Sequence, residues 1–262
     1  MAQPDFAIGI QARLGSTRLP GKVLFQLGNS THTSLSLMVR RIRANPNLCD
    51  VPITLLTTNL ECDIAIVNLA ERLKVSSIQG SVEDVLGRYA DLATSTGALN
   101  IIRLTGDCPL IDSHEILRLM ALHKESKADY TTNTYAESPT PDGLDVEIIS
   151  SETLLKSSSQ ACLPSEREHV TFNIASTSSF QTVRSPMITA METYTRLTLD
   201  TSWDYQLLSF IVNSLKCPVS ATTSEILKVY SDNDLGDLVS HIVKNSGWDS
   251  AFEADIKFLD KS

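Results

Sequence analysis

The sequence of 262 residues has few cysteines, a shortage of basic residues and no long apolar run, and each shortage excludes a class of protein. Its five cysteines are dispersed without a Cys-x-x-Cys pair, which predicts reduced thiols in a cytoplasmic protein and not a disulfide framework. Acidic residues outnumber basic ones by 31 to 22, and the net charge of −9 argues against a nucleic-acid-binding protein. No apolar run approaches the ~20 residues that span a bilayer, and residues 1–5 lack the basic start of a signal peptide. We therefore expect a cytoplasmic protein that binds neither nucleic acid nor a membrane.

Several common catalytic signatures are missing as well. The sequence contains no Gly-x-Gly-x-x-Gly fingerprint, no zinc-ligand spacing and no pattern that indicates a Ser/His/Asp triad. A glycine-containing segment follows the first apolar run, but five residues separate Gly15 from Gly21, where the P-loop of ATPases has four. Val23 also stands where a P-loop has the hydroxyl that holds magnesium. These absences exclude the best-known phosphate-binding loops but not phosphate binding itself.

The segment 11–22, Gln-Ala-Arg-Leu-Gly-Ser-Thr-Arg-Leu-Pro-Gly-Lys, has the composition of a polyphosphate-binding loop. It follows the strand predicted at 6–10, and its glycines allow backbone N–H groups to approach phosphate oxygens. Arg13, Arg18 and Lys22 supply three cations within ten residues, and the planar fork of arginine matches phosphate oxygens. The alternative interpretation is a surface loop with some basic residues. Because the whole chain is acidic, we expect this local cluster to bind one small anion.

Strands and helices alternate through the first half of the chain. Apolar runs predict strands at 6–10, 51–58, 75–78 and 100–104, and helical spacing of apolar residues follows each of them. This alternation indicates right-handed βαβ units and a mainly parallel sheet, which binds ligands at the carboxyl ends of its strands. The segment 11–22, the pair Gly80-Ser81 and Asp107 all follow predicted strands, so we expect them at the same edge of the sheet.

The second half is less regular, and its expectations are more local. Further strands are predicted at 129–133, 144–149 and 195–199, and helices at 150–160, 224–230 and 232–245. Helix starts are predicted from pairs at capping-box spacing, namely Ser81 with Asp84, Ser165 with Glu168, and Thr201 with Asp204. The last of these helices is expected to bury a face made of Trp203, Leu207, Phe210 and Ile211.

Two aspartates follow predicted strands at widely separated positions. Asp107 lies in a Gly-Asp-Cys-Pro turn after the strand at 100–104, and Asp200 follows the strand at 195–199. Mg²⁺ bound with nucleotide phosphates prefers carboxylate oxygens, so either residue could supply a ligand. The alternatives are a turn residue for Asp107 and a residue that charges a helix N-terminus for Asp200.

These segments together resemble the KDO and acylneuraminate cytidylyltransferase group, and the string at 11–22 is most similar to its SpsF-like branch. Matching motifs recur in the family's order, at 80–89, 105–112, 143–147, 166–171 and 196–204. The resemblance implies an α/β, Rossmann-like three-layer nucleotidyltransferase fold with a mainly parallel sheet. The length and the lack of a linker or repeat predict one domain over residues 1–262. We expect a nucleotide-binding half at 1–128, an excursion at 129–185 for sugar binding or dimer contacts, and a return to the core at 186–262. The protein would be a homodimer.

By the same resemblance, the protein would activate a sugar with CTP, releasing pyrophosphate and a CMP-sugar, with Mg²⁺ or Mn²⁺ as cofactor. The acceptor would be a nonulosonic or related keto-sugar acid for surface polysaccharide or glycan synthesis. Triphosphate binding and catalysis are assigned to Arg13, Arg18 and Lys22, and the metal to Asp107 and Asp200. Nucleotide binding is assigned to Ala12, Arg13, Gly15, Ser16, Arg18, Lys22, Gly80, Ser81 and Asp107, and sugar binding to Asp145, Glu147, Arg167, His169 and Arg196. The sequence singles out no general base.

One departure leaves the sugar open: Thr171-Phe172-Asn173-Ile174 stands where the family has Thr-Pro-Tyr-Ile. From the residues alone, Arg167 and His169 also fit a solvated first helical turn. Two rival functions keep the fold, namely a nucleotidyltransferase acting on a sugar 1-phosphate and a glycosyltransferase consuming a nucleotide sugar. A nucleotide sensor without turnover is a third.

Overall fold

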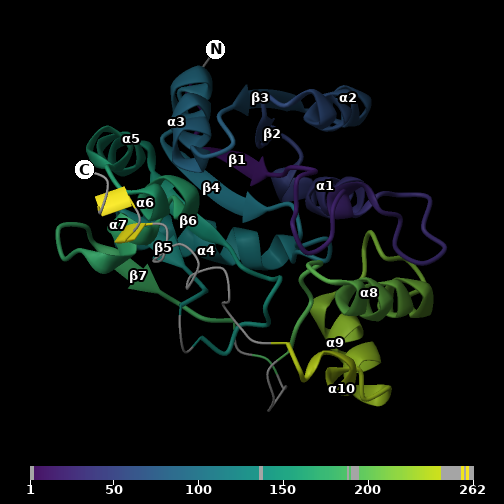
Figure 1. Ribbon diagram of the computed structural model, residues 1–262. Coiled ribbons are helices and arrows are strands. Elements are labelled where there is room, and N and C mark those ends of the chain that lie inside the picture. Colours follow the sequence, from purple (N-terminus) through teal and green to yellow (C-terminus); the bar gives the residue numbers. More distant parts are fainter. Residues whose placement is uncertain are drawn as a thin grey trace.

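One mostly parallel sheet organises the computed structural model of the chain (Figure 1). The structure describes residues 3–135, 138–187, 189, 195–242, 255–256 and 258–259, and over these the sheet has seven strands. The strands are β1 (Phe6–Gln11), β2 (Ile53–Thr58), β3 (Ser76–Gly80), β4 (Asn100–Thr105), β5 (Tyr130–Thr132), β6 (Glu147–Ser150) and β7 (Thr182–Arg184). Their order is β3-β2-β1-β4-β6-β5-β7, and β6 runs antiparallel to both of its neighbours. The predicted α/β fold with a mainly parallel sheet is confirmed.

Helices connect and cover these strands. They are α1 (Ser34–Arg43), α2 (Ile64–Leu73), α3 (Val85–Thr96), α4 (Ser113–Ser126), α5 (Ser151–Gln160), α6 (Pro164–His169), α7 (Phe172–Ser176), α8 (Ser202–Ser214), α9 (Thr223–Asp232) and α10 (Gly236–Val239). Short 3₁₀ helices occur at η1 (Lys22–Leu24), η2 (Pro46–Leu48) and η3 (Glu61–Asp63). Within the described part of the chain, no helix combines the length and apolar composition needed to cross a bilayer.

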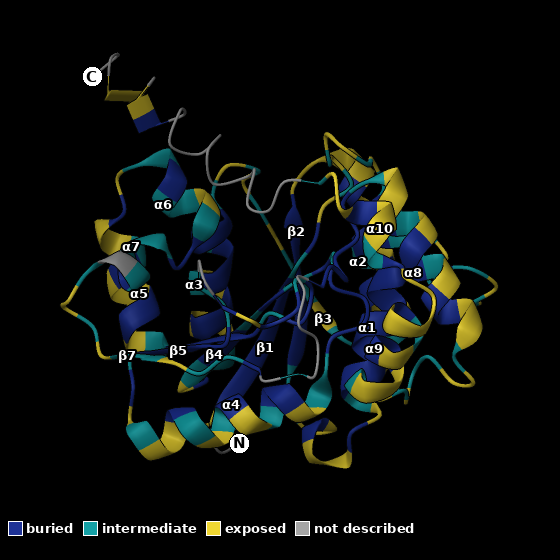
Figure 2. Ribbon diagram, turned by 90° about the horizontal axis from the view of Figure 1, so that it is seen from below, coloured by how far each residue is buried: buried dark blue, intermediate teal, exposed yellow. Residues whose placement is uncertain are grey.

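The core divides into layers because alternate residues of each strand face opposite sides of the sheet. Ile8 and Ile10 of β1 pack with α1, α2 and α4, whereas Ala7 packs with α3 and α5 on the other face. A third cluster joins α8, α9 and α10 to Leu27, Leu197 and other residues next to the first loop. Figure 2 shows the buried strands between the group α3, α5, α6 and α7 and the group α1, α2, α8, α9 and α10. The segment 129–185 belongs to the sheet, since it supplies β5, β6 and β7.

The strands of the first half begin and end close to their predicted positions, but those of the second half are shorter. The strand expected at 144–149 begins at Glu147 as β6, and the strand expected at 129–133 is reduced to the three residues of β5. The strand expected at 195–199 is wrong: this segment is extended but makes only an isolated bridge, between Arg196 and Asp142. It hydrogen-bonds to loops instead, since Leu199 N donates to Asp107 O over 2.7 Å.

Helix starts were predicted correctly in one of three cases. Thr201 and Asp204 form the expected capping box of α8. The cap of α3, however, is Asp84 itself, whose side chain accepts the Gly87 N–H, and Ser81 lies before it. Helix α6 begins earlier than predicted because Pro164, with its fixed φ, occupies the first helical position. Glu166 then accepts the Leu163 N–H over 2.9 Å, a role predicted for the pair of Ser165 and Glu168.

The predicted apolar face of α8 is half correct. Leu207 and Ile211 are buried, but Trp203 and Phe210 are 44% and 42% exposed, and Leu208 and Val212 take their place in the core. The helix expected at 232–245 is replaced by the end of α9 at Asp232 and by the short α10. Its residues after 242 lie outside the described part of the chain. All five cysteines are unpaired, as predicted.

Candidate active site

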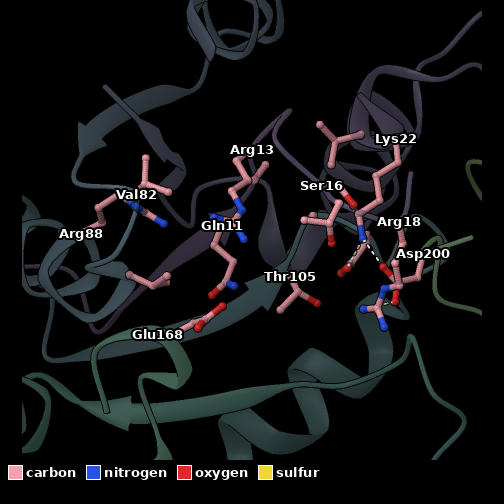
Figure 3. A pocket seen from close by; sticks show the side chains of 16 residues that line it. Gln11, Arg13, Ser16, Arg18, Lys22, Val82, Arg88, Thr105, Glu168 and Asp200 are labelled. Atoms are coloured by element: carbon pink, nitrogen blue, oxygen red, sulfur yellow. Dashed lines mark hydrogen bonds and ion pairs between the residues drawn. The ribbon is translucent and has the colours of Figure 1, made fainter. Parts of the chain in front are cut away.

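A cleft of about 240 Å³ lies at the carboxyl ends of β1 and β4, where the parallel sheet was expected to bind a ligand (Figure 3). The predicted residues that line it are Ala12, Arg13, Ser16, Arg18, Lys22, Asp107 and Asp200. Gly15, Gly80 and Ser81 are not part of the lining, although Val82, directly after them, is. The structure therefore brings the basic loop and both predicted metal ligands into one cavity.

The basic loop is held in place by a buried carboxylate. Leu14 N donates to Asp63 Oδ1 over 2.8 Å, and Asp63 is fully buried and also accepts the hydroxyl of Thr58. The loop closes with a hydrogen bond of 2.9 Å from Gly21 N to Leu14 O. Gly21 has a φ of +75°, which glycine adopts without strain, and this turn begins η1 at Lys22. Asp63 is a positioning residue that the sequence analysis missed, since a single Asp in a helix start gives no signal.

Lys22 joins the two predicted metal ligands. Its Nζ donates to Asp107 Oδ2 over 2.8 Å and to Asp200 Oδ1 over 3.0 Å, and Arg18 pairs with the other oxygen of Asp200 (Figure 3). Because both bonds end on one nitrogen, the carboxylates lie well within the ~10 Å beyond which one ion with ~2.1 Å bonds could not be shared. We call Arg18, Lys22, Asp107 and Asp200 the cleft cluster.

Electrostatics keep the cleft cluster charged. Burial disfavours the ammonium of Lys22, but the carboxylates of Asp107 and Asp200 outweigh it and raise the lysine pKa. Burial likewise acts to raise the pKa of Asp107, but the charge and hydrogen bond of Lys22 lower it below its ordinary value. The four groups thus form an ion-pair network at neutral pH, open to the cleft on the sides of Arg18 and Asp107.

Asp200 reaches the cleft through the turn before α8. Its backbone N–H donates to Asp204 Oδ2 over 3.0 Å, and Asp204 is clamped by Arg196 through bonds of 2.8 and 3.1 Å. Arg196 also pairs with Asp142 over 2.8 Å, so this buried guanidinium ties the turn to the loop before β6. Across the cleft, Gly106 allows the other aspartate turn to come close to β1, because a Cβ there would lie 2.9 Å from Gln11 O.

The opposite end of the cleft is formed by the start of α3. Val82, Val85 and Arg88 line it, and Arg88 is 3% exposed and donates to the carbonyl of Ser81. Burial is the main cause that lowers the pKa of Arg88. Arg88 thereby holds the turn at Gly80-Ser81.

The lining also contains residues to which no role was assigned, among them Gln11, Thr105 and Glu168. Gln11 is the last residue of β1, and Thr105 is the last residue of β4. Glu168 comes from α6, which packs against α3. The position of Gln11 in the cleft could have been inferred from its place at the end of a strand. For Glu168, the sequence pattern indicated only a role in capping a helix.

None of the five residues predicted to bind sugar lines the cleft. Arg196 bonds to Asp204 and Asp142, as described above. Arg167 donates to Ala161 O over 2.8 Å, and its Nη1 lies 3.6 Å from Asp84 Oδ1. His169 is half-buried, and burial lowers its pKa, so its imidazole is neutral at pH 7. Asp145 accepts the Gly143 N–H over 3.1 Å, and burial, followed by the charge of Asp142, raises its pKa to about 7. Their role in sugar binding stays a prediction.

Glu147, the fifth of these residues, lies inside a second group of charges. Its carboxylate accepts bonds from Arg103, from Tyr130 and, over 2.8 Å, from Thr171. We call Arg103, Tyr130, Glu147 and Thr171 the sheet cluster. Burial disfavours the charged guanidinium, but Glu147 outweighs it and raises the pKa of Arg103 above its usual range. The sheet cluster joins β4, β5 and β6 to the segment that follows α6.

A cationic loop and two carboxylates thus lie together at one edge of a mostly parallel sheet, and comparison with known proteins identifies the family. A cytidylyltransferase family model matches residues 7–216, and the chain belongs to this family of CTP-dependent nucleotidyltransferases. It is 30% identical over 241 residues to the spore coat polysaccharide biosynthesis protein SpsF of Bacillus subtilis, covering 87% of this chain and 95% of SpsF.

Solved structures agree with this assignment. The chain superposes with a TM-score of 0.81 on a cytidylyltransferase from Leptospira borgpetersenii, at 30% identity and with coverage of 92% of this chain and 98% of that one. It shares the fold of a CMP-2-keto-3-deoxy-manno-octonic acid synthetase solved with CTP, with a TM-score of 0.52, 14% identity and coverage of 75% and 93%.

Proposed function

We propose that this protein transfers CMP from CTP to a hydroxyl of a sugar, giving a CMP-sugar and pyrophosphate for surface polysaccharide or glycan synthesis. The observation that carries the proposal is the cleft cluster, in which two cations and two carboxylates converge at the edge of the sheet. Two related proteins support it, because one is named for polysaccharide biosynthesis and the other was solved with CTP. We also propose a cytoplasmic homodimer, as expected from the sequence.

The cations of the cleft cluster would bind the triphosphate. Lys22 and Arg18 are held against carboxylates, so they lie at the cleft wall with their charges maintained. Phosphate oxygens compete well for such groups, because charge-assisted hydrogen bonds to phosphate are strong. In the transfer, the sugar hydroxyl attacks the α-phosphorus in line, and Lys22 and Arg18 stabilise the charge that develops on the leaving pyrophosphate.

The carboxylates of Asp107 and Asp200 fit a hard divalent cation. Among the described residues, no group of three or more His, Cys, Asp or Glu is arranged to hold a metal, which excludes a dedicated all-protein cage there. Mg²⁺ is instead bound in nucleotide sites through one or two carboxylates together with phosphates. Lys22 Nζ already shows that one cation can contact both aspartates. When bound, Mg²⁺ or Mn²⁺ would neutralise phosphate charge and make the sugar hydroxyl easier to ionise.

The acceptor proposed from the family resemblance is a keto-sugar acid of eight or nine carbons. The test is to incubate the full chain with CTP, Mg²⁺ and a panel of such acids, together with sugar 1-phosphates, and to measure pyrophosphate and the nucleotide product. We expect pyrophosphate and a CMP-sugar with at least one acid, and a rate lower by roughly 10²-fold with Lys22→Ala. Product formation only from sugar 1-phosphates, or release of a nucleoside diphosphate, would contradict the proposal.

A further inference from the structure

Two side chains that line the cleft, Gln11 and Glu168, carry hydrogen-bond acceptors to which no role has been assigned. Gln11 Oε1 is buried, and within the described part of the chain it has no hydrogen-bond partner. Glu168 lines the same cleft, and in Figure 3 its carboxylate and the Gln11 amide point toward one another. A buried acceptor without a partner is destabilising, so such an atom at a site indicates that a ligand supplies the missing donor.

The backbone next to Glu168 is strained in a way that fixes its position. Val170 has a φ of +56° and a ψ of −58°, a conformation that a β-branched residue rarely adopts. The Thr171 N–H donates back to His169 O, which closes a tight γ-turn with Val170 at its centre. Strain of this kind persists where the surroundings impose it, and it occurs mainly at functional sites.

The surroundings that impose the turn lie on both sides of it. Val170 is 1% exposed, so its side chain cannot leave the core without loss of packing. After the turn, Thr171 Oγ1 donates to Glu147 of the sheet cluster over 2.8 Å. Before it, Arg167 contacts Asp84 at the cap of α3. The sheet cluster therefore anchors the segment that presents Glu168, although Glu147 itself does not line the cleft.

The position of the two acceptors along the cleft selects the part of the ligand that they meet. Figure 3 places Gln11 and Glu168 between the cleft cluster at one end and Val82 with Arg88 at the other. This inference rests on the proposed function, in which the triphosphate binds at the cleft cluster. Gly80 and Ser81, assigned above to nucleotide binding, come directly before Val82, so we take the base to bind at that end of the cleft. The group between phosphate and base in a nucleotide is the ribose, whose 2′ and 3′ hydroxyls are two adjacent donors.

We propose that Gln11 and Glu168 bind the vicinal diol of the nucleotide ribose, so that this wall selects ribonucleotides over deoxyribonucleotides. The acceptor sugar could offer the same diol chemistry, so the test must separate the two sources. The measurement is the Kd of CTP, 2′-deoxy-CTP and 3′-deoxy-CTP by titration calorimetry with Mg²⁺ and without any acceptor sugar. Wild-type protein should bind CTP about 10- to 100-fold more tightly than at least one deoxy analogue, as expected for a hydroxyl bonded to a charged group.

Glu168→Gln should reduce this preference by about 10-fold and Gln11→Met by about 3-fold. In both variants the affinity for CTP should fall, while the affected deoxy analogue binds as tightly as it does to the wild type. Glu125→Gln, an exposed position on α4, is the matched control and should change nothing. Circular dichroism of each variant checks the fold.

Equal binding of CTP and both analogues to the wild type would overturn the proposal, and so would a variant that weakens all three ligands equally. If Glu168→Gln leaves nucleotide binding unchanged but raises the KM of an acceptor sugar, the diol belongs to the acceptor and the ribose assignment is wrong. Failure of the proposed function looks different: discrimination at the ribose would remain, while no acceptor yields pyrophosphate.

Discussion

The cleft cluster and the sheet cluster contain the same kinds of charged group in opposite surroundings. In the cleft cluster, Lys22 and Asp200 are buried, but the side chains of Arg18 and Asp107 are 49% and 29% exposed. In the sheet cluster, those of Arg103 and Glu147 are only 12% and 7% exposed. A ligand can therefore exchange partners with the first cluster. The second is enclosed by strands, and each of its bonds is made within the protein.

The difference shows how an ion pair at a site can be distinguished from one that holds the fold. Asp107, Asp200 and Glu147 were all assigned ligand roles from motifs of the same family. Asp107 lies in the turn after β4 and Asp200 in the turn before α8, and both line the cleft, but Glu147 is the first residue of β6 and bonds to three neighbours. If the comparison is correct, changes to the cleft cluster should affect activity, and changes to the sheet cluster should affect stability.

The largest effect is expected from loss of the metal or its ligands. Activity should fall to background with EDTA and return with Mg²⁺ or Mn²⁺, because without a cation the triphosphate faces the carboxylates of Asp107 and Asp200. Asp107→Asn and Asp200→Asn should each lose turnover by about 10³-fold or more and stay folded. Because both serve one ion, the double variant should be little worse than either single variant. Pyrophosphate release checks this, and full activity after dialysis against chelator would contradict it.

Glu147→Gln should lower the free energy of unfolding by about 3–5 kcal/mol, because it leaves the guanidinium of Arg103 in the sheet without its counter-charge. Urea unfolding is the measurement. The control is the double variant Arg103→Met with Glu147→Leu, which removes both charges and should recover most of the loss. A Glu147→Gln variant of wild-type stability with impaired acceptor binding would instead restore its predicted role in sugar binding.

Lys22→Ala and Arg18→Ala should each lower kcat/KM by roughly 10²-fold, or about 3 kcal/mol of transition-state stabilisation. Arg18→Ala should change the melting temperature little, because its side chain is half-exposed. Lys22→Ala should lower it, because Asp107 and Asp200 lose the cation that they share, so activity is measured at a temperature where the variant is folded. Near-normal rates in both variants would refute the assignment of the triphosphate to this loop.

Discrimination between bases tests the opposite end of the cleft. If the turn at Gly80-Ser81 and Arg88 forms the base pocket, CTP should exceed UTP and ATP as donor by about 10²-fold in kcat/KM, because a wrong base leaves buried polar groups unpaired. Initial rates with the three nucleotides at equal concentration measure this. Equal rates would show that this end of the cleft does not discriminate between bases.

The smallest effect concerns Asp145, whose pKa is raised to about 7 by burial and by the charge of Asp142. Between pH 4 and 7 the folded protein holds a proton that the unfolded chain has lost, so this group makes the fold less stable as pH rises through that window. Asp145→Asn should therefore raise the free energy of unfolding by about 1–2 kcal/mol at pH 8 and change it little at pH 4. An equal effect at both pH values would show that the carboxylate does not titrate in this range.

Most of the first half was predictable because its signals are local. Apolar runs and helical periodicity located β1 to β4 and the helices between them. The rule that parallel sheets bind ligands at carboxyl ends then placed Arg13, Lys22 and Asp107 at one edge. Asp200 could be placed there only by family resemblance, since the segment before it forms no regular strand and reaches Asp107 through backbone bonds to loops.

The remainder depends on tertiary contacts that leave little trace in a single sequence. The burial of Glu147 and Arg196 follows from their partners Arg103 and Asp204, and each charge alone looks like a ligand for an anion or a sugar. Similarly, Pro164 rather than Ser165 starts α6. Glu168 lines the cleft near the end of this helix, which is followed by a non-glycine residue, Val170, with a positive φ. Sequence patterns disfavour that conformation, so the turn could not be anticipated.

The pair of Arg103 and Glu147 also bears on synthesis of the chain. In the sheet β6 lies between β4 and β5, but the ribosome makes it after β5, so β4 is an edge strand until β6 arrives. An uncovered edge is a template for pairing with other chains, and a charge within the strand opposes such pairing. Arg103 supplies that charge on nascent β4, and Glu147 neutralises it when the correct neighbour is added. The charge that disfavours pairing at the open edge of β4 is therefore the one that Glu147 neutralises in the finished sheet.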